Sequence, residues 1–568
     1  MAPRGRNCPT SDPKKMRFMR LVRAGNCQKV REFVLSGAVA ADATDDHGFT
    51  GLIGAAVNGD VDMAETLLEL GCPLEARNDT DNTALTVAGK HNHLQMVRFL
   101  LSKGADPATT IDGIPIVLLC AGNKNQLGIL KTLVDAGADK NAKLHELDGA
   151  PLISVAASLG YAKAVEYLLS KGSDPHLEDD RGRTPVFYAI PSKKEGYGAE
   201  AREIVAMLAK AGADLNEAFL CFGGMEGRVD VMLHLLELGA DPNYADEEGR
   251  NVPCAAIAND RPRVIRALKG SGCDLDKVYD EFPPIVPMAG EGHKECVKAL
   301  LFAGARVDAV GPDKRTALSV AASMGKLDMC EILVGAGADV NRRCPERTPL
   351  YYAAIHDHTA IVKYLLSAGA DASLTMGDDF TVLGHCAHDE DVGVETLRLL
   401  VAAHPSADNL NMALGCAIDK GRLEVAEMLI DAGASVNGVI KDGESALLIA
   451  TKKRHLDIVR MLVRRGADVN GEIRVGGRAV TALVLFATLG EEDMVDLLVE
   501  LGADVNLLHP LHGACASGRL SIVCKLMARG ASAEAIDDDG YNALDVAEEL
   551  ERDDVMAFLE RRAREIRL

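Results

Sequence analysis

The sequence predicts an all-α fold, an α-solenoid built from stacked helix pairs. Three observations support this prediction. A pattern of helix cap, apolar stripe and glycine returns about every 33 residues along most of the 568-residue chain, and self-similarity at such a period is typical of repeat arrays. Hydrophobic residues make up 48% of the chain, but only 4% of the residues are aromatic and Trp is absent. This composition suits thin layers of Leu, Val and Ala rather than one deep core.

Residues 348–373 show how one unit is expected to form. Thr348 suits a helix N-cap, and Pro349 suits the first helical position, where a missing N–H costs nothing. A first apolar stripe follows, then a polar break at 356–358, then a second stripe that includes Val362 and Leu365. Gly369 can take the left-handed conformation that ends a helix. The unit is therefore predicted to be an antiparallel helical hairpin.

The same hairpin pattern recurs about 17 times. In clear copies the cap and the closing Gly are 21 residues apart, as from Thr348 to Gly369. Clear units begin at Thr50, Thr83, Asn251, Thr316, Thr348, Ser445 and Thr481. Units with weaker caps begin at Met16, Ala218, Pro283, Met412 and His509, and irregular units begin near Ile114, Ala150, Thr184, Thr381 and Asn542. Because one such hairpin cannot bury its apolar face alone, the units are expected to stack on one another.

These residues resemble the ankyrin repeat family. The Thr-Pro-Leu-His-x-Ala motif of that family is matched by "TPVFYA" at 184, "TPLYYA" at 348 and "HPLHGA" at 509, and its ending is matched by "GADVN" at 337, 466 and 502. Few units carry the full motif, and only His512 matches its His, which indicates a diverged member. The resemblance implies a helix pair with a β-turn finger in each unit, and protein binding through the fingers and the inner helices.

Boundaries follow from the same registration. Residues 1–14 are expected to be a basic N-terminal extension, residues 15–560 the repeat array, and residues 561–568 the end of the last capping helix. We use the word finger for the segment between the closing Gly of one unit and the cap of the next. Near 213–217, 405–411 and 503–508 this segment is too short for a full finger. Each gap either bends the stack, leaves a notch where a partner enters, or reflects drift without a function.

No enzyme motif is present in the sequence. Walker-type, H-E-x-x-H and G-x-S-x-G patterns are all missing, so the sequence predicts neither catalysis nor a cofactor. "HCAHDED" at 385–391 places His385 and His388 one helical turn apart, but two or three ligands without a distant partner are weak evidence for a metal site. No metal site is therefore predicted. The 14 cysteines lack framework spacing and read as small buried hydrophobes of a reducing, cytoplasmic compartment.

Charge bears on the partners. The formal net charge is −22, and acidic residues gather in the finger segments. These include Asp45–Asp46, Asp179 and Asp180, Glu247 and Glu248, Asp280–Glu281, Asp378–Asp379 and Asp537–Asp539. Such an acidic edge would repel nucleic acid and anionic membranes and attract basic protein segments. The alternative is that Asp is there because tight turns favour it.

The groove along the inner helices supplies further candidates. In the ankyrin family the two residues after the Ala pair of the first helix point into this groove. An apolar strip with polar neighbours is expected at Phe222, Met225, Glu226, Val320, Met324, Tyr352, Ile355 and His356. A basic group that could accept an acidic peptide is expected at Lys420, Lys452 and Lys453. The alternatives are that the strip belongs to the core and that the lysines are merely solvated.

Together these patterns predict a non-enzymatic scaffold or adaptor that binds partner proteins through the finger edge and the inner-helix groove. It is expected to act as a monomer or within a hetero-complex, without membrane insertion. One alternative is a structural component of a larger assembly, such as a cytoskeletal or axonemal complex. Another is an enzyme or ligand sensor with a site inside the solenoid.

Overall fold

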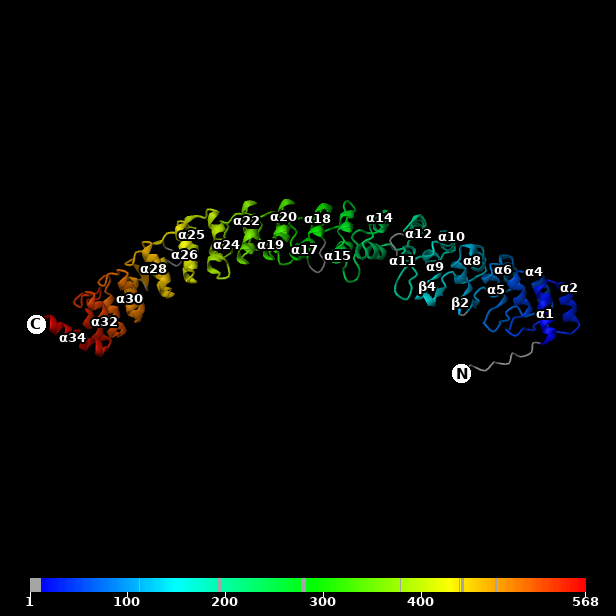
Figure 1. Ribbon diagram of the computed structural model, residues 1–568, viewed down its shortest axis with the longest axis horizontal. Helices are drawn as coiled ribbons and strands as arrows, with labels where there is room; N and C mark the ends of the chain where they lie inside the picture. Colours follow the sequence, from blue (N-terminus) through cyan, green and yellow to red (C-terminus); the bar gives the residue numbers. More distant parts are fainter. Residues whose placement is uncertain are drawn as a thin grey trace, which may run out of the picture. The chain divides into compact units, whose positions relative to one another are not determined.

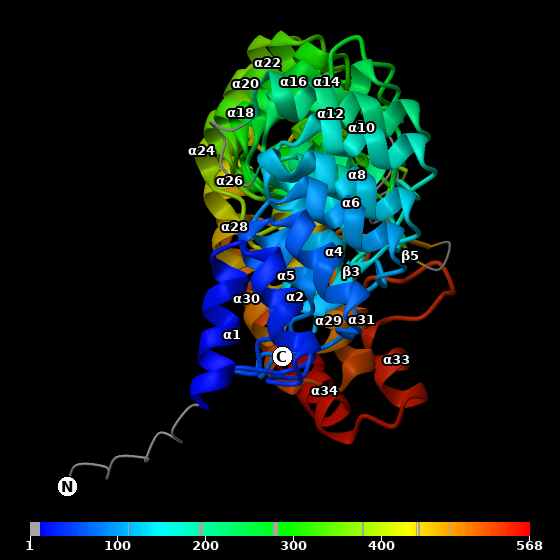
Figure 2. The same ribbon diagram turned by 90° about the vertical axis from the view of Figure 1, so that its right-hand side faces the viewer.

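The computed structural model describes residues 12–111, 113–191, 197–276, 282–377, 380–438, 440, 444–475 and 478–567. The chain divides between Asp274 and Leu275 into two compact units. Each unit is a succession of short antiparallel helix pairs, as the sequence predicts (Figure 1). In the first unit the second helices of consecutive pairs, α4, α6, α8 and α10, follow one another along one side (Figure 2).

The first unit contains helices α1 to α16 and two short strand pairs. Its elements are α1 (Pro13–Arg23), α2 (Cys27–Leu35), α3 (Gly51–Asn58), α4 (Val61–Glu69), α5 (Ala84–Lys90), α6 (Leu94–Ser102), β1 (Thr110–Ile111), β2 (Ile114–Pro115), α7 (Ile116–Ala121), η1 (Lys124–Gln126), α8 (Leu127–Asp135), β3 (Lys143–Leu144), η2 (His145–Leu147), β4 (Ala150–Pro151), α9 (Leu152–Ser158), α10 (Ala162–Ser170), α11 (Pro185–Ala189), α12 (Ala199–Lys210), α13 (Asn216–Ala218), the π-helical η4 (Phe219–Met225), α14 (Val229–Glu237), α15 (Val252–Ala258) and α16 (Pro262–Ala267).

The second unit contains helices α17 to α34 and one strand pair. Its elements are α17 (Ile285–Glu291), α18 (Lys294–Ala303), α19 (Ala317–Ser323), α20 (Leu327–Gly335), α21 (Pro349–Ile355), α22 (Thr359–Ser367), α23 (Val382–His388), α24 (Val394–Ala402), α25 (Ala407–Asp419), α26 (Leu423–Asp431), α27 (Ala446–Lys452), α28 (Leu456–Arg464), β5 (Ile473–Val475), β6 (Arg478–Val480), α29 (Ala482–Leu489), α30 (Glu492–Glu500), α31 (Pro510–Ser517), α32 (Leu520–Ala528), α33 (Ala543–Glu549) and α34 (Asp553–Arg567).

Side-chain caps start the inner helices where the sequence predicts them. The Thr348 hydroxyl accepts a hydrogen bond from the backbone N–H of Tyr351, and Pro349 occupies the first turn of α21. Thr316 and Ser319 form a reciprocal capping box at α19. The closing glycines have left-handed backbones, as at Gly369 with φ of 93°, which a residue with a side chain adopts only at a cost.

Hydrogen bonds between neighbouring pairs tie each stack together. The residue just before the second helix of a pair contacts the first helix of the previous pair. His93 Nε2, before α6, lies 2.9 Å from the carbonyl oxygen of Val57 in α3, and His358 Nε2, before α22, lies 3.0 Å from that of Ser323 in α19. At the base of a finger, an Asn side chain also bonds to a neighbouring pair. Asn341 donates a hydrogen bond to the carbonyl oxygen of Gly369, the closing Gly of the next pair. Each pair is therefore stabilised mainly by its immediate neighbours.

Fingers are short hairpins where they are complete. The strand pairs β1–β2, β3–β4 and β5–β6 are antiparallel, and single bridges such as Thr44 to Thr50 and Val310 to Thr316 close other fingers. Asp280–Glu281 and Asp378–Asp379, two of the predicted acidic finger pairs, lie outside the described residues.

Three helices begin earlier than the sequence pattern suggests, and α13 is one of them, since it begins at Asn216 rather than at Ala218. α1 begins at Pro13, inside the segment expected to precede the array, because the Asp12 carboxylate accepts a hydrogen bond from the N–H of Lys14 and caps the helix. α25 begins at Ala407, five residues before the Met412 that the registration gives, because the Ser406 hydroxyl accepts from the N–H of Asn409. Residues 407–411 therefore extend the inner helix instead of forming a hairpin.

Candidate partner-binding groove

The predicted apolar strip of the second unit runs from the middle of α19 and α21 to the residue that follows each helix. Met324 is 59% exposed, His356 is exposed, and Val320, Tyr352 and Ile355 are half-buried. Such partly exposed side chains can contact another molecule while they remain packed against the neighbouring helices. These five residues therefore remain candidates for partner contacts.

Tyr352 is already engaged within the unit. Its hydroxyl donates to the carbonyl oxygen of Cys344 at 2.8 Å, and the guanidinium carbon of Arg315 lies 5.0 Å from the centre of its ring. Burial raises the pKa of the phenol. A partner would thus meet the edge of Tyr352 and the covering Arg315 rather than a free hydroxyl.

In the first unit, the expectation that Phe222 contributes to an exposed strip is wrong. Its side chain is only 2% exposed, and its ring packs 4.8 Å from that of Phe187, centroid to centroid. Phe222 lies on the π-helical turn η4, where Gly224 leaves room for α15: a Cβ on Gly224 would come 2.7 Å from Ala255 Cβ. Met225 and Glu226, at the end of the same turn, are half-buried.

The predicted acidic edge is only partly available. Asp179 is buried, so the expectation that it meets a partner is wrong. Its carboxylate accepts hydrogen bonds from the Tyr188 hydroxyl at 2.7 Å, from Arg183 Nε at 2.6 Å and from the backbone N–H of Arg181 at 2.8 Å. The neighbouring Asp180 is exposed.

Other fingers divide their acids in the same way. Asp45, Asp246 and Asp537 each accept backbone N–H bonds that shape the turn. Glu247 and Glu248 are exposed, and Glu248 forms an ion pair with Arg250 at 3.1 Å. The first carboxylate of a finger thus accepts the hydrogen bonds that shape the turn, whereas carboxylates later in the finger, such as those of Glu247 and Glu248, face solvent.

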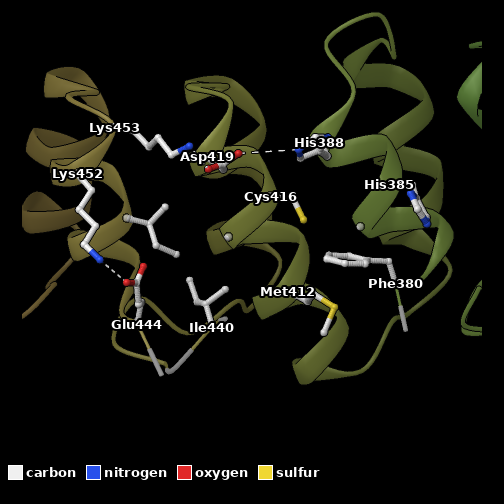
Figure 3. A pocket seen from close by; sticks show the side chains of 13 residues that line it. Phe380, His385, His388, Met412, Cys416, Asp419, Ile440, Glu444, Lys452 and Lys453 are labelled. Carbon is white, nitrogen blue, oxygen red and sulfur yellow. Dashed lines mark hydrogen bonds and ion pairs between the residues drawn. The ribbon is translucent and has the colours of Figure 1, made fainter. Parts of the chain in front are cut away.

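A hollow of about 580 Å³ opens between α23, α25 and α27 of the second unit. Figure 3 shows Phe380 and Ile440 on opposite sides of this space, with Met412 between them. Lys452 and Lys453 extend from α27, Asp419 from α25, and His388 from α23. Residues 405–411, which directly precede Met412, are too few to form a full finger.

The floor of the hollow is apolar and has glycines at two helix positions. Gly384 and Gly415 occupy the place that Tyr351 takes in α21. A Cβ built on Gly415 would come 2.2 Å from Ile440 Cγ2, and one on Gly384 would come 3.1 Å from Phe380 Cδ1. The two finger side chains therefore rest directly on helix backbone. Because Gly384 and Gly415 have no side chains, Phe380 and Ile440 can lie against the helices and leave the hollow unfilled.

The rim of the hollow is charged. Lys453 Nζ lies 2.7 Å from Asp419 Oδ1, and His388 Nε2 lies 3.8 Å from Asp419 Oδ2. The hydrogen bond from Lys453 lowers the pKa of Asp419. Lys452 pairs with Glu444. All these side chains are at least 31% exposed, so their pairings can exchange with those of an incoming molecule.

A shallower depression adjoins the hollow. It is lined by Tyr351, Ile355, Lys420 and the acidic pair Asp389–Glu390, and it shares His385 and His388 with the hollow. Aromatic contacts connect the two, since the His385 ring lies 5.3 Å from that of Tyr351 and 5.7 Å from that of Phe380. Four predicted residues, Ile355, Lys420, Lys452 and Lys453, thus line one continuous surface.

Phe380, Met412 and Ile440 were not anticipated as groove residues. The signals that could have found them were the short segment at 405–411 and the glycines at 384 and 415. His385 and His388 were considered only as weak metal ligands. Within the part of the chain that the structure describes, no group of three or more His, Cys, Asp or Glu side chains is placed to hold a metal ion.

Comparison with known proteins identifies the family. The family model described as "Ankyrin repeats (3 copies)" matches residues 18–111, 117–218, 286–376, 383–473 and 435–509, which together are more than half of the chain. The chain therefore belongs to the ankyrin repeat family, whose repeats are generally protein–protein interaction modules.

Several relatives share part of this sequence. The ankyrin repeat and KH domain-containing protein mask-1 of Caenorhabditis elegans is 27% identical over 52% of this chain and 10% of its own length. The E3 ubiquitin-protein ligase KEG of Arabidopsis thaliana is 27% identical over 40% of this chain and 15% of its own length. The chain thus spans a small fraction of these relatives. The ankyrin repeat domain of human ASB11 is 21% identical, with a TM-score of 0.28, over 41% of this chain and 92% of that domain.

Proposed function

We propose that this protein is an interaction scaffold or adaptor, which binds partner proteins through its finger edge and its inner-helix groove without catalysing a reaction. The observation that carries the proposal is the hollow between α23 and α27, which combines an apolar floor with a charged, exposed rim. Interfaces concentrate binding free energy where an anchor side chain fills such a site and a polar rim surrounds it.

Two further features support protein partners. The exposed carboxylates Asp180, Glu247 and Glu248 on the fingers of the first unit, in a chain of net charge −22, favour basic protein segments and disfavour nucleic acid.

None of the helices in the described ranges is long and apolar enough to cross a bilayer. We propose a cytoplasmic location and action as a monomer or within a hetero-complex.

Quantitative capture from cell extract with matched variants tests this function. Lys452→Glu reverses one charge at the hollow, and Lys90→Glu makes the same change at the corresponding position of α5, where Lys90 is exposed. We expect the Lys452→Glu variant to recover at least one partner several-fold less than the wild-type chain, and the Lys90→Glu variant to recover that partner normally. Identical recovery by all three chains would contradict a binding role for this part of the groove.

A further inference from the structure

We propose that the hollow accepts a turn of a partner protein, which takes the place of the finger absent before α25, inserts one large apolar side chain and presents a carboxylate to Lys452. This inference rests on the proposed binding function and specifies its occupant. It concerns residues 380–453 of the second unit.

Neighbouring fingers in this protein bind one another through their backbones. In the first unit the N–H of Asp79 donates to the carbonyl oxygen of His47 at 3.2 Å, and the N–H of Asp180 donates to that of Asp148 at 2.7 Å. One turn beside another is therefore a packing arrangement that this fold already uses. Before α25 the row of turns has no member, because residues 407–411 are helical.

Asp or Asn is absent from the first turn position of both fingers that flank this place, as it is from the finger that has Gly311 there. Most turns that close with a backbone bond begin with Asp or Asn, whose side-chain oxygen accepts the turn amides, as Asp45 and Asn78 do. Ile440 takes the first position here, and its N–H donates to the carbonyl oxygen of Glu444 at 2.9 Å. An Ile there forgoes the side-chain hydrogen bonds that stabilise the turn, and it remains half-buried at the edge of the hollow.

Phe380 lies on the other side of the space. It occupies the residue before the helix cap, where Phe49 and Phe282 stand in other units and where Arg315 and Arg347 of the two preceding fingers cover tyrosine rings. Phe380 is likewise half-buried and lines the hollow. Apolar side chains thus lie on two faces of the same space, which suits an apolar occupant.

Charge permits an acidic occupant. The lining of the hollow carries two lysines against two carboxylates, a formal charge of zero with histidine neutral, whereas the whole chain has a net charge of −22 on the same count. An acidic segment therefore meets less repulsion here than the chain's overall charge implies. Lys452 and Glu444, 40% and 31% exposed, form a pair of small net stability that a partner carboxylate can displace.

Three fluorescein-labelled hairpin peptides of about a dozen residues provide the probes. All share one Asn-Gly turn; the first has Leu beside the turn and two flanking Asp, the second replaces Leu by Ser, and the third replaces both Asp by Lys. Fluorescence anisotropy with the full chain is expected to show the first peptide binding at least tenfold more tightly than either other peptide.

Variants of the chain locate the binding. Met412→Glu places a charge on the floor of the hollow, whereas Leu489→Glu places one at the exposed end of α29, outside the hollow. In a finger-restored chain, residues 405–411 are replaced by a copy of residues 305–315, so that a finger of the chain itself fills the place. We expect Met412→Glu and the restored finger to weaken binding of the Leu–Asp hairpin at least tenfold, and Leu489→Glu to leave it unchanged, with circular dichroism reporting that each chain is folded.

Absence of binding by the Leu–Asp hairpin, preference for the Lys hairpin, or binding that survives Met412→Glu would each overturn the inference. The proposed scaffold function would stand in those cases if Lys452→Glu still reduced partner capture from extract. Failure of both measurements would remove the function together with its occupant.

Discussion

At the scale of single residues, the sequence predicts the finger or helix face on which a side chain lies more reliably than it predicts how far that side chain is buried. Asp179 and Asp180 are adjacent acids of one finger, yet the first is buried and holds the turn while the second is exposed. Phe222 fits the expected strip, but the π-helical turn η4 buries it against Phe187. Neither outcome follows from repeat spacing. The burial of Asp179 depends on hydrogen bonds within its own finger and with α11, and that of Phe222 depends on contact with the preceding helix pair.

The buried carboxylate of Asp179 predicts a pH-dependent contribution to stability. Burial alone raises its pKa, but hydrogen bonds from Tyr188, Arg183 and Arg181 outweigh burial and lower the pKa to about 2. Since the ordinary value is 3.8, the ionised group stabilises the fold above about pH 4, and this contribution is lost as the pH falls through about 2.

Asp179→Asn is therefore expected to lower the free energy of unfolding by about 2 kcal/mol at pH 7, with a difference that shrinks toward pH 2. Urea unfolding at a series of pH values measures this. Asp180→Asn is the matched control and should change stability by less than about 0.5 kcal/mol. An Asp179→Asn effect that did not vary with pH would contradict the assigned role.

At the scale of elements, caps and glycines predict the helix pairs well. Thr348 and Gly369 mark α21 and the end of α22 as expected from their chemistry. The start of α25 was predicted five residues too late, because Ser406 provides a cap outside the repeat register. The hollow beside α25 was not predicted, because it depends jointly on this helix start and on the small residues at 384 and 415.

The links between helix pairs predict a local response to mutation. Arg422 joins the α25–α26 pair to α23, since Nη1 donates to the carbonyl oxygens of Cys386 at 2.7 Å and Asp389 at 2.6 Å. Arg422→Met should cost about 2–3 kcal/mol by removing charge-assisted bonds to partly buried carbonyls. Hydrogen exchange should accelerate across 382–431 and stay unchanged across 12–274.

Arg398→Met is the control for this prediction, because Arg398 is 57% exposed and its nearest carboxylate, on Glu424, lies 3.8 Å away. It should leave exchange within error of the wild-type chain. Faster exchange throughout both units after Arg422→Met would indicate cooperativity beyond neighbouring pairs and contradict the nearest-neighbour account.

At the scale of the whole molecule, the repeat period predicts the fold class, and the motifs within the repeats carry the resemblance to the ankyrin repeat family. Many small registered patterns outweigh the weakness of each, so the ankyrin assignment did not need the full motif in every unit. Function is less predictable from the period, since the residues that distinguish one array from another lie at its exceptions. Among those exceptions are the short segments at 213–217, 405–411 and 503–508, and the one at 405–411 directly precedes Met412, which lines the hollow together with Phe380 and Ile440.

Crosslinking mass spectrometry of the full chain in cell extract tests the central claim of a binding groove most directly. Lys420, Lys452 and Lys453 lie on the groove, whereas Lys363 and Lys298 belong to the second helices α22 and α18. We predict that crosslinks to other proteins concentrate on the first three lysines and on the fingers. Crosslinks confined to the second helices would contradict the account.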